Sequence, residues 1–264
     1  METQRLVELP DELLLKILSL LPMYKDTVAT RLISKRWEDP WKLEPDVMFD
    51  DETYESFETF MSFVYGSLLS NDAQILERLH LKLISQYNSA SDINFWVQIA
   101  VNRFVRELRF DLFGETLELP SCLSTCRTLK TLILHELSIT VVPPWFRLPS
   151  LKTLHLLYVK FSGKEYVSSL LKVCPVLECL VIDKTKDDNV IILISDIIVP
   201  TLRSLSIRSD RELRLFGKTL QLCRTLEELN PYLLLLGVGL VFHHSKRCTL
   251  YRLSSPTTNL FQVF

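Results

Sequence analysis

Glycine is scarce in this chain, with six among 264 residues. No stretch matches the phosphate-binding loop G-x-x-x-x-G-K, the nucleophile turn G-x-S-x-G or the zinc-protease motif H-E-x-x-H. Such motifs hold backbone N–H groups or side chains around a reacting group at a fixed spacing. We therefore predict that the chain is not an enzyme and has no catalytic residues, no metal site and no cofactor.

An excess of positive charge is also lacking, because 30 basic residues are balanced by 32 acidic ones and the net charge is −2. Proteins that bind nucleic acids or anionic membranes usually carry a basic surface that neutralises phosphate groups. The sequence therefore predicts a chain that binds no nucleic acid and no membrane.

Long apolar runs and N-x-S/T glycosylation sites are absent as well. Residues 232–242 form an apolar run of eleven residues, whereas a membrane-spanning helix needs about 20. The apolar stretch at 9–22 follows acidic residues, which is atypical of a secretory signal. We expect the chain in a reducing compartment, the cytoplasm or the nucleus.

Basic residues are missing altogether from residues 43–77, which hold nine acidic side chains. Two interpretations of this acidic segment stay open. It is either a solvated linker and helix face or a docking site for a basic partner.

A repeated pattern, L-x-x-L-x-L, organises most of the chain. Successive copies are 29, 24, 22, 26 and 25 residues apart, within the 20–29 range of leucine-rich repeats. A single short strand cannot bury its apolar face, so stacked copies are expected to share one core. The pattern predicts an α/β fold, an irregular leucine-rich-repeat solenoid. The copies begin at Leu76, Val105, Leu129, Leu151, Leu177 and Leu202, and a weaker copy begins at Leu226.

The fourth and sixth positions of each copy are expected to point inward, because side chains alternate between the two faces of a strand. The flanking positions then form an array on the concave face, which suits a protein or peptide partner. His135 and His155 are expected at equivalent places of adjacent copies. The predicted target-binding residues are Arg109, Asp111, Ile133, His135, His155, Leu157, Asp183 and Arg208.

Three cysteines recur at one place in the repeat, three residues before the first leucine of a copy. No cysteine pair has the C-x2-C spacing of a zinc knuckle with histidines following it. We therefore expect each thiol to replace a small hydrophobic side chain. The place is held by Cys126, Cys174 and Cys223, and in other copies by Leu148 and Val199.

The stretch "LPDELLLKILSLLP" at 9–22 predicts a short helix, which begins near Pro10 and ends at Pro22. Its apolar side chains cover more of the circumference than the stripe of an ordinary surface helix. Either the helix is buried on both sides within its own domain, or one face packs there and another binds a partner chain.

Two further short helices are predicted, at about 25–33 and 34–42. Asp26 or Thr27 is expected to cap the first helix and Ser34 the second. Three short helices form a very small core, and a module of this size usually needs a metal, disulfides or association for stability. Since no cysteine lies here, we expect a second chain to cover the apolar helix.

The stretches "LPDELLLKILSLLP" and "KDTVATRLISKRW", followed by "LPSCLSTCRTLKTLIL" and "LPSLKTLHLLYVKF", resemble the plant F-box/leucine-rich-repeat proteins of the FBD-associated type. The resemblance covers about residues 5–215, and the tail does not resemble an FBD domain. Three expectations for the tail stay open: a divergent cap, a truncation, or the product of an altered exon. The expected organisation is a three-helix F-box at 5–42, an acidic helical linker at 43–75, repeats at 76–230 and a divergent tail at 231–264.

The resemblance implies the substrate-recognition subunit of an SCF-type (cullin-RING) E3 ubiquitin ligase. In that family the F-box binds a Skp-type adaptor and the repeats bind a target protein. Two alternatives stay open: an interaction scaffold without a role in ubiquitination, and a truncated, non-productive receptor. Carried over by position, the adaptor-binding residues, some of them core residues, are Leu9, Pro10, Leu13, Leu14, Ile17, Leu18, Leu21, Pro22, Val28, Leu32, Ser34 and Trp37.

Overall fold

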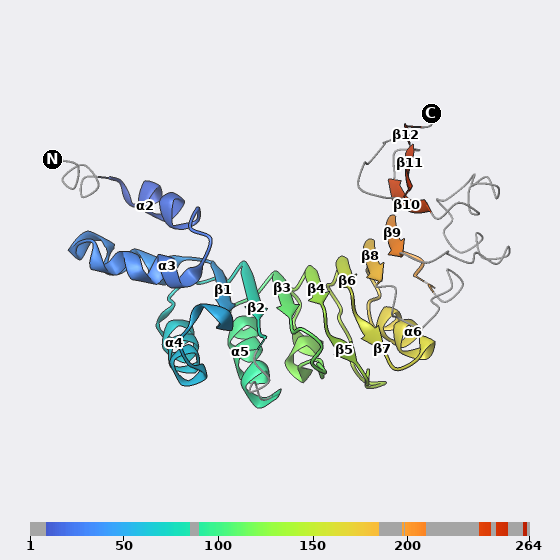
Figure 1. Ribbon diagram of the computed structural model, residues 1–264, viewed down its shortest axis with the longest axis horizontal. Helices are drawn as coiled ribbons and strands as arrows, with labels where there is room; N and C mark the ends of the chain where they lie inside the picture. The colour runs from blue at the N-terminus through green and yellow to red at the C-terminus, as the bar shows by residue number, and fades with distance from the viewer. Residues whose placement is uncertain are drawn as a thin grey trace. The chain divides into compact units, whose positions relative to one another are not determined.

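The computed structural model describes residues 9–84, 90–184, 197 and 199–209, together with the backbone of three short strands further along the chain. The chain divides into two compact units, residues 1–111 and 112–264. Each unit combines parallel strands with helices, so the fold is mixed α/β (Figure 1). Within the described residues, no helix has the length and apolar character needed to span a membrane.

Three parallel strands form the sheet of the first unit, in the order β1 (Asp46–Asp50), β2 (Arg78–Lys82) and β3 (Glu107–Asp111). The helices α4 (Phe57–Ser70) and α5 (Ala90–Asn102) lie on one side of these strands (Figure 1). Both helices bury residues at a spacing of three to four, which places them on one helical face. These residues are Phe60, Val64 and Leu68 in α4, and Ile93, Trp96, Val97 and Ala100 in α5.

Strand β1 was not predicted from the sequence. It lies in the segment 43–75 that was expected to be a helical linker, although α4 in the same segment is indeed a helix. Val47 and Phe49 alternate with outward-facing residues and are buried, as in a repeat copy. The leucine pattern therefore missed a strand whose inward positions hold valine and phenylalanine.

The N-terminal segment has two α-helices, α2 (Asp11–Leu18) and α3 (Tyr24–Ala29), and three 3₁₀ turns. The prediction of a third helix at 34–42 was wrong. Two of the turns, η2 (Lys35–Trp37) and η3 (Pro40–Leu43), replace it, because Pro40 cannot continue a helix from the preceding turn. The remaining turn, η1 (Thr30–Leu32), extends α3.

The predicted helix caps were also wrong. Asp26 and Thr27 lie inside α3, which begins after Met23. Ser34 makes no capping bond at η2, and its hydroxyl is buried without a hydrogen-bond partner. The cap at Ser34 was expected for a helix over residues 34–42, and the structure replaces that helix with two 3₁₀ turns.

Four parallel strands follow one another in the sheet of the second unit: β4 (Thr131–His135), β6 (Thr153–Leu157), β8 (Cys179–Lys184) and β9 (Ser204–Ser209). Two-residue strands, β5 (Ser138–Ile139) and β7 (Lys160–Phe161), pair in a separate sheet. The segments between strands include the 3₁₀ turn η5 (Ser121–Thr125) and the helix α6 (Lys164–Lys172).

The repeat prediction is confirmed in register. Six strands, β2, β3, β4, β6, β8 and β9, each begin two residues after the first residue of a copy, and these first residues are buried. The strands β4 and β6 pair Leu132 with Leu154 and Leu134 with Leu156, so the fourth and sixth positions stack in one core. The buried first positions are Leu76, Val105, Leu129, Leu151, Leu177 and Leu202.

The thiols of Cys126 and Cys174 are buried among these leucines, as predicted, and burial raises the pKa of the Cys174 thiol to about 12. Cys223 and the weak copy at Leu226 lie outside the described residues. In the tail, β10 (Val238–His243), β11 (Arg247–Arg252) and β12 (Phe261–Gln262) are antiparallel strands, and β10 pairs with β9. The tail strands therefore do not continue the parallel pattern.

Candidate functional site

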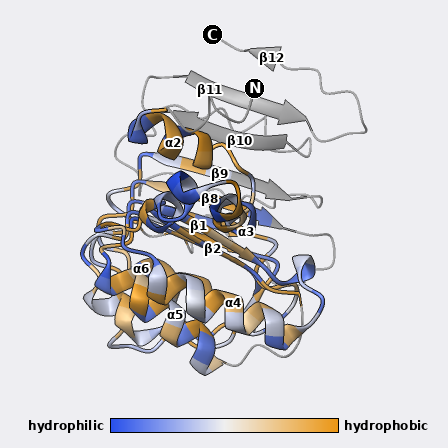
Figure 2. Cartoon of the chain, turned by 90° about the vertical axis from the view of Figure 1, so that its left-hand side faces the viewer, coloured by the Kyte–Doolittle hydropathy of each residue, from blue (hydrophilic) through white to orange (hydrophobic). Residues whose placement is uncertain are grey.

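Helix α2 uses one face for its own unit and leaves another uncovered. Leu14 and Leu18 are 0% and 1% exposed, whereas Leu13 is 46% exposed and Leu20, just after the helix, is 77% exposed. Figure 2 shows α2 as a mostly orange, hydrophobic helix with a hydrophilic end. Burial on both sides within its own domain is therefore excluded as the explanation of its wide apolar surface.

Further apolar side chains of the N-terminal segment are exposed beyond α2. Leu32 in η1 is 82% exposed, and Ile33 and Leu43 are each about half exposed. Together with Leu13 and Leu20 they form a set that we name the N-terminal apolar set. A partner that covers these side chains would remove their apolar surface from water, so the set is a candidate interaction surface.

The twelve residues predicted to bind an adaptor fall into two groups. Four are buried and hold the N-terminal helices and turns together: Leu14, Leu18, Val28 and Trp37. The other eight are accessible to different degrees: Leu9, Pro10, Leu13, Ile17, Leu21, Pro22, Leu32 and Ser34. The prediction omitted the exposed residues Leu20, Ile33 and Leu43. Leu20 could have been found from the sequence, because it is an apolar residue next to the polar end of the predicted helix.

The outward-facing side of the strands in the first unit is charged and internally paired. Lys82 in β2 donates hydrogen bonds to Glu52 at 2.7 Å and to Asp50 at 2.9 Å, and these two carboxylates raise the pKa of Lys82. Arg78 pairs in the same way with Asp46 of β1. Part of the negative charge of residues 43–77 is therefore paired with basic residues of the first repeat. Neither a solvated face nor a docking site for a basic partner accounts for these paired carboxylates.

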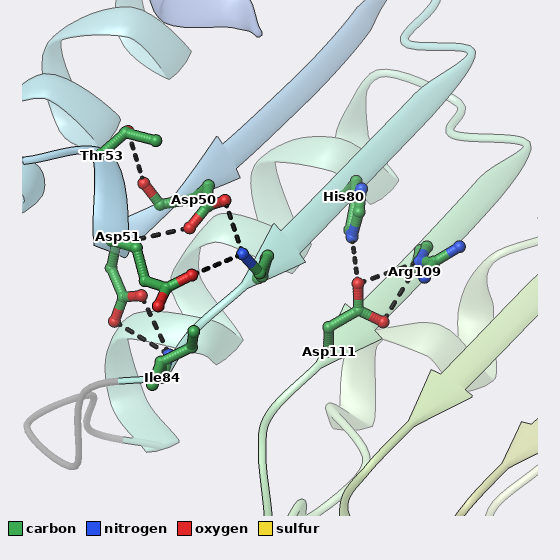
Figure 3. Close-up of polar contacts among 9 residues, drawn as sticks. Asp50, Asp51, Thr53, His80, Ile84, Arg109 and Asp111 are labelled. Carbon is green, nitrogen blue, oxygen red and sulfur yellow. Dashed lines mark hydrogen bonds and ion pairs between the residues drawn. The ribbon is translucent and has the colours of Figure 1, made fainter. Parts of the chain in front are cut away.

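Asp51 adds a backbone contact to this cluster. Its two carboxylate oxygens accept the N–H of Ile84 at 2.9 and 3.1 Å (Figure 3). The carboxylate thereby holds the end of β2 against the turn η4 (Asp51–Thr53). These acidic residues organise the first unit, and this role requires no basic partner.

Asp111 was predicted to bind a target, yet its environment shows a structural role. It is 4% exposed, and its carboxylate bonds His80 at 2.6 Å and Arg109 at 3.1 Å (Figure 3). Burial opposes its charge, but the hydrogen bonds from His80 and Arg109 outweigh burial and lower the pKa of Asp111. Arg109 is partly exposed, and one of its nitrogens is engaged by this carboxylate.

The outward-facing side of the strands in the second unit is mostly neutral. The register pairs Ile133 with His155 and His135 with Leu157. The expectation that the two histidines occupy equivalent places was therefore wrong, because His135 lies two positions further along its copy. Leu157 in turn pairs with Asp183 of β8.

Aromatic rings continue this neutral surface at the ends of the strands. The ring of His135 lies 6.3 Å from that of Phe113 and 5.7 Å from that of Tyr158, between centroids. Of the predicted target residues, Arg208 lies in β9 opposite Asp183, and its side chain is outside the described part of the chain. Arg109 and Asp111 lie on β3 of the first unit. The remaining five, Ile133, His135, His155, Leu157 and Asp183, form one continuous register on β4, β6 and β8.

Glu44, between η3 and β1, is a buried carboxyl that sequence reasoning did not single out. It is 3% exposed, and its Oε2 atom has no hydrogen-bond partner. Burial, reinforced by the nearby charge of Asp46, raises the pKa of Glu44 from 4.5 to about 7. The folded chain therefore binds a proton at Glu44 more tightly than the unfolded chain does.

We expect the replacement Glu44→Gln to stabilise the chain above pH 7. Because the folded-state pKa is raised, the stability contributed by the protonated form is lost as pH rises from about 4.5 to 7. The loss amounts to about 3 kcal/mol at pH 8, and glutamine avoids it. Melting curves at pH 5 and pH 8 test this, with the exposed Glu55→Gln as the matched control. A Gln variant that melts below the wild type at pH 8 would contradict the prediction.

Among the described residues, no group of three or more His, Cys, Asp or Glu side chains is arranged to hold a metal ion. Two described surfaces carry the residues predicted to contact partners: the N-terminal apolar set, and the neutral side of β4, β6 and β8. Both suit contacts with other macromolecules, since they offer apolar and aromatic side chains without a reactive centre.

Comparisons with known proteins match both parts of the chain. Residues 6–40 match a family model described as F-box-like, and residues 93–230 match the leucine-rich repeats of FBD-associated F-box protein At5g56370. The chain is 70% identical to the Arabidopsis thaliana protein "Putative FBD-associated F-box protein At5g56560" over 80% of this chain and 50% of that protein.

A second Arabidopsis thaliana relative, "F-box/FBD/LRR-repeat protein At5g56570", is 54% identical over 78% of this chain and 45% of its own length. The chain thus spans about half the length of the curated relatives it matches. No solved structure matches it.

Proposed function

Because the chain belongs to the family of FBD-associated F-box proteins with leucine-rich repeats, we propose that it is the substrate-recognition subunit of an SCF-type (cullin-RING) E3 ubiquitin ligase. Its N-terminal apolar set binds a Skp-type adaptor, and its repeats bind a target protein. The chain performs no bond chemistry of its own. It raises the effective concentration of the target beside a ubiquitin-carrying enzyme held elsewhere in the ligase.

The observation that carries the proposal is the exposure of Leu13, Leu20 and Leu32 on a small module whose core is already filled. Leu14, Leu18 and Trp37 supply that core. Burial of these exposed leucines by a partner would favour binding by about 25 cal/mol for each Å² of apolar surface removed from water. The proposal also places the chain in the cytoplasm or nucleus, as the sequence predicted.

Co-purification with a Skp-type adaptor tests the proposal. The full chain, expressed with the adaptor, is expected to form a stoichiometric complex that survives gel filtration and then recruits a cullin. An interaction scaffold unrelated to ubiquitination would not bind the adaptor. A non-productive receptor would bind it but would leave the ubiquitination of every captured protein unchanged.

The target surface is proposed to lie on β4, β6 and β8 of the second unit. We expect the double replacement Ile133→Glu and Leu157→Glu to reduce target capture at least tenfold while leaving adaptor binding intact. Buried apolar anchors in interfaces contribute about 1–2 kcal/mol or more each, and a carboxylate in their place would be desolvated without a partner. Quantitative affinity capture from source cells measures the effect.

The matched control for this experiment is Val176→Glu, at an exposed apolar position of the second unit that lies outside the strands. The control is expected to capture the same proteins as the wild type. Equal loss of captured proteins in both variants would show that the proposed surface has no special role.

A further inference from the structure

A cavity of about 310 Å³ lies within the first unit, where the segment joining α2 to α3 faces the outward side of β1 and β2. One wall is apolar and includes Leu18, Leu21 and Met48. Another wall carries the carboxyl groups of Glu44 and Asp46. The volume is at the lower end of the range for small-molecule sites, and the mixture of apolar and polar lining is typical of them.

Two carboxylate oxygens at this wall lack partners. Glu44 Oε2 and Asp46 Oδ1 are both buried and accept no hydrogen bond. A buried polar atom without a partner costs free energy, because water no longer solvates it. Glu44 is more than nine-tenths buried and borders the cavity, so an unsatisfied acceptor is available to a group bound there.

The basic residues that line the cavity are, by contrast, already paired. Arg78 is bonded to the other carboxylate oxygen of Asp46, Oδ2. Arg109 and His80 both contact Asp111. The unsatisfied groups are therefore acceptors, and a bound cation fits the cavity better than a bound anion.

We propose that this cavity binds an aliphatic ammonium group, with Glu44 and Asp46 accepting its hydrogen bonds and the apolar wall packing against its methylene chain. A primary ammonium group supplies three N–H donors, and its alkyl chain matches the neighbouring leucine and methionine side chains. A free aliphatic amine and a lysine side chain of a bound protein share this chemistry.

A metal ion fits less well, because no third ligand stands beside these two carboxyl groups in the described structure. The charge of Asp46 also opposes ionisation of Glu44, so a cation beside the two carboxyl groups is favoured. A single positive group between them relieves this repulsion. The proposal concerns a site that is separate from the N-terminal apolar set and from the neutral strands of the second unit.

Calorimetric titration of the full chain with n-pentylamine at pH 8 tests the proposal, with 1-pentanol as the uncharged probe. Pentylamine is expected to bind at millimolar concentration or tighter and to raise the melting temperature, whereas pentanol binds at least tenfold more weakly. The replacement Glu44→Gln should weaken pentylamine binding at least tenfold. The exposed Glu55→Gln serves as control and should bind as the wild type does.

The peptide acetyl-Ala-Lys-Ala-amide provides the second arm. Binding of pentylamine alone assigns the cavity to a free amine, and binding of the peptide with equal or higher affinity assigns it to a lysine side chain. Equal binding of pentylamine and pentanol, or equal binding of pentylamine by the wild type and Glu44→Gln, overturns the proposal. A melting curve of Glu44→Gln confirms that the variant is folded.

Discussion

Replacing Asn71 by leucine is expected to destabilise the first unit by about 3 kcal/mol. Asn71 is 1% exposed, and its Nδ2 atom donates to the carbonyl of Glu44 at 2.9 Å and to the hydroxyl of Tyr24 at 3.2 Å. Its Oδ1 atom accepts from Arg103 at 2.7 Å and from the backbone of Ala73 at 3.1 Å. Leucine has a similar volume but leaves all four partners without this amide.

The location of these partners makes the effect large. Tyr24 belongs to α3, Glu44 follows η3, Ala73 follows α4 and Arg103 follows α5. One amide therefore joins the N-terminal helices to the repeats within the first unit. The buried carbonyl of Glu44 and the partly buried guanidinium of Arg103 would lose this partner, and neither fully recovers the water that it lost on folding. Tyr24 belongs to the same polar cluster, and its burial raises the pKa of its phenol to about 12.

Urea denaturation followed by tryptophan fluorescence measures the loss, since three of the four tryptophans, Trp37, Trp41 and Trp96, lie in the first unit. The matched control is Asn102→Leu, because Asn102 is exposed and accepts only from Gln98 at 2.9 Å. The control should shift stability by less than about 0.5 kcal/mol. Equal shifts in both variants would show that the Asn71 bonds are not a central contact.

The double replacement Leu20→Asp and Leu32→Asp is expected to weaken binding of a Skp-type adaptor by at least about 100-fold. Two apolar anchors that each contribute about 2 kcal/mol would give more than this factor if they acted independently. Both side chains are more than three-quarters exposed, so the replacements leave the core of Leu14 and Leu18 intact. The melting temperature should therefore change little.

Surface plasmon resonance with immobilised adaptor measures the affinity, and Val141→Asp is the matched control. Val141 is 54% exposed and lies in the second unit, outside the N-terminal segment. The control should bind adaptor as tightly as the wild type. A double variant that binds within threefold of the wild type would exclude Leu20 and Leu32 as adaptor contacts.

The strands of the repeats were predictable to the residue because their signal is local. A leucine at the first position, followed by inward residues at positions four and six, defines both where a strand begins and which face it buries. Leu129 and Leu151 illustrate this, since β4 and β6 begin two residues after them. The burial of Cys126 and Cys174 was predictable from the same periodicity, because both lie three residues before the first leucine of a copy.

Features that depend on contacts between distant residues were not predictable in this way. Lys82 lies 32 residues after Asp50, so their ion pair requires the register of β1 against β2, and β1 itself was missed. The third N-terminal helix failed for a local reason, because Pro40 starts a separate turn. Asn71 lacked any pattern that distinguished it from a loop residue.

The sequence predicted in part which candidate site residues face a partner and which have a structural role. The wide apolar surface of the segment 9–22 indicated a partner-facing side, and Leu13 is half exposed as that interpretation requires. The sequence could not show that the Asp111 carboxylate is hydrogen-bonded to His80 and Arg109. By its position in the copy, Asp111 was expected to face outward and to be available to a target. The structure was needed to distinguish the charged strand surface of the first unit, whose side chains pair with one another, from the neutral strand surface of the second unit.

Hydrogen exchange of the full chain, with and without a Skp-type adaptor, tests the central claim most directly. We expect the adaptor to slow amide exchange in residues 11–33, which include α2, α3 and η1, and to leave β4, β6 and β8 unchanged. Unchanged exchange in residues 11–33 at saturating adaptor, or slowing confined to the repeat strands, would contradict the proposed role of the N-terminal apolar set.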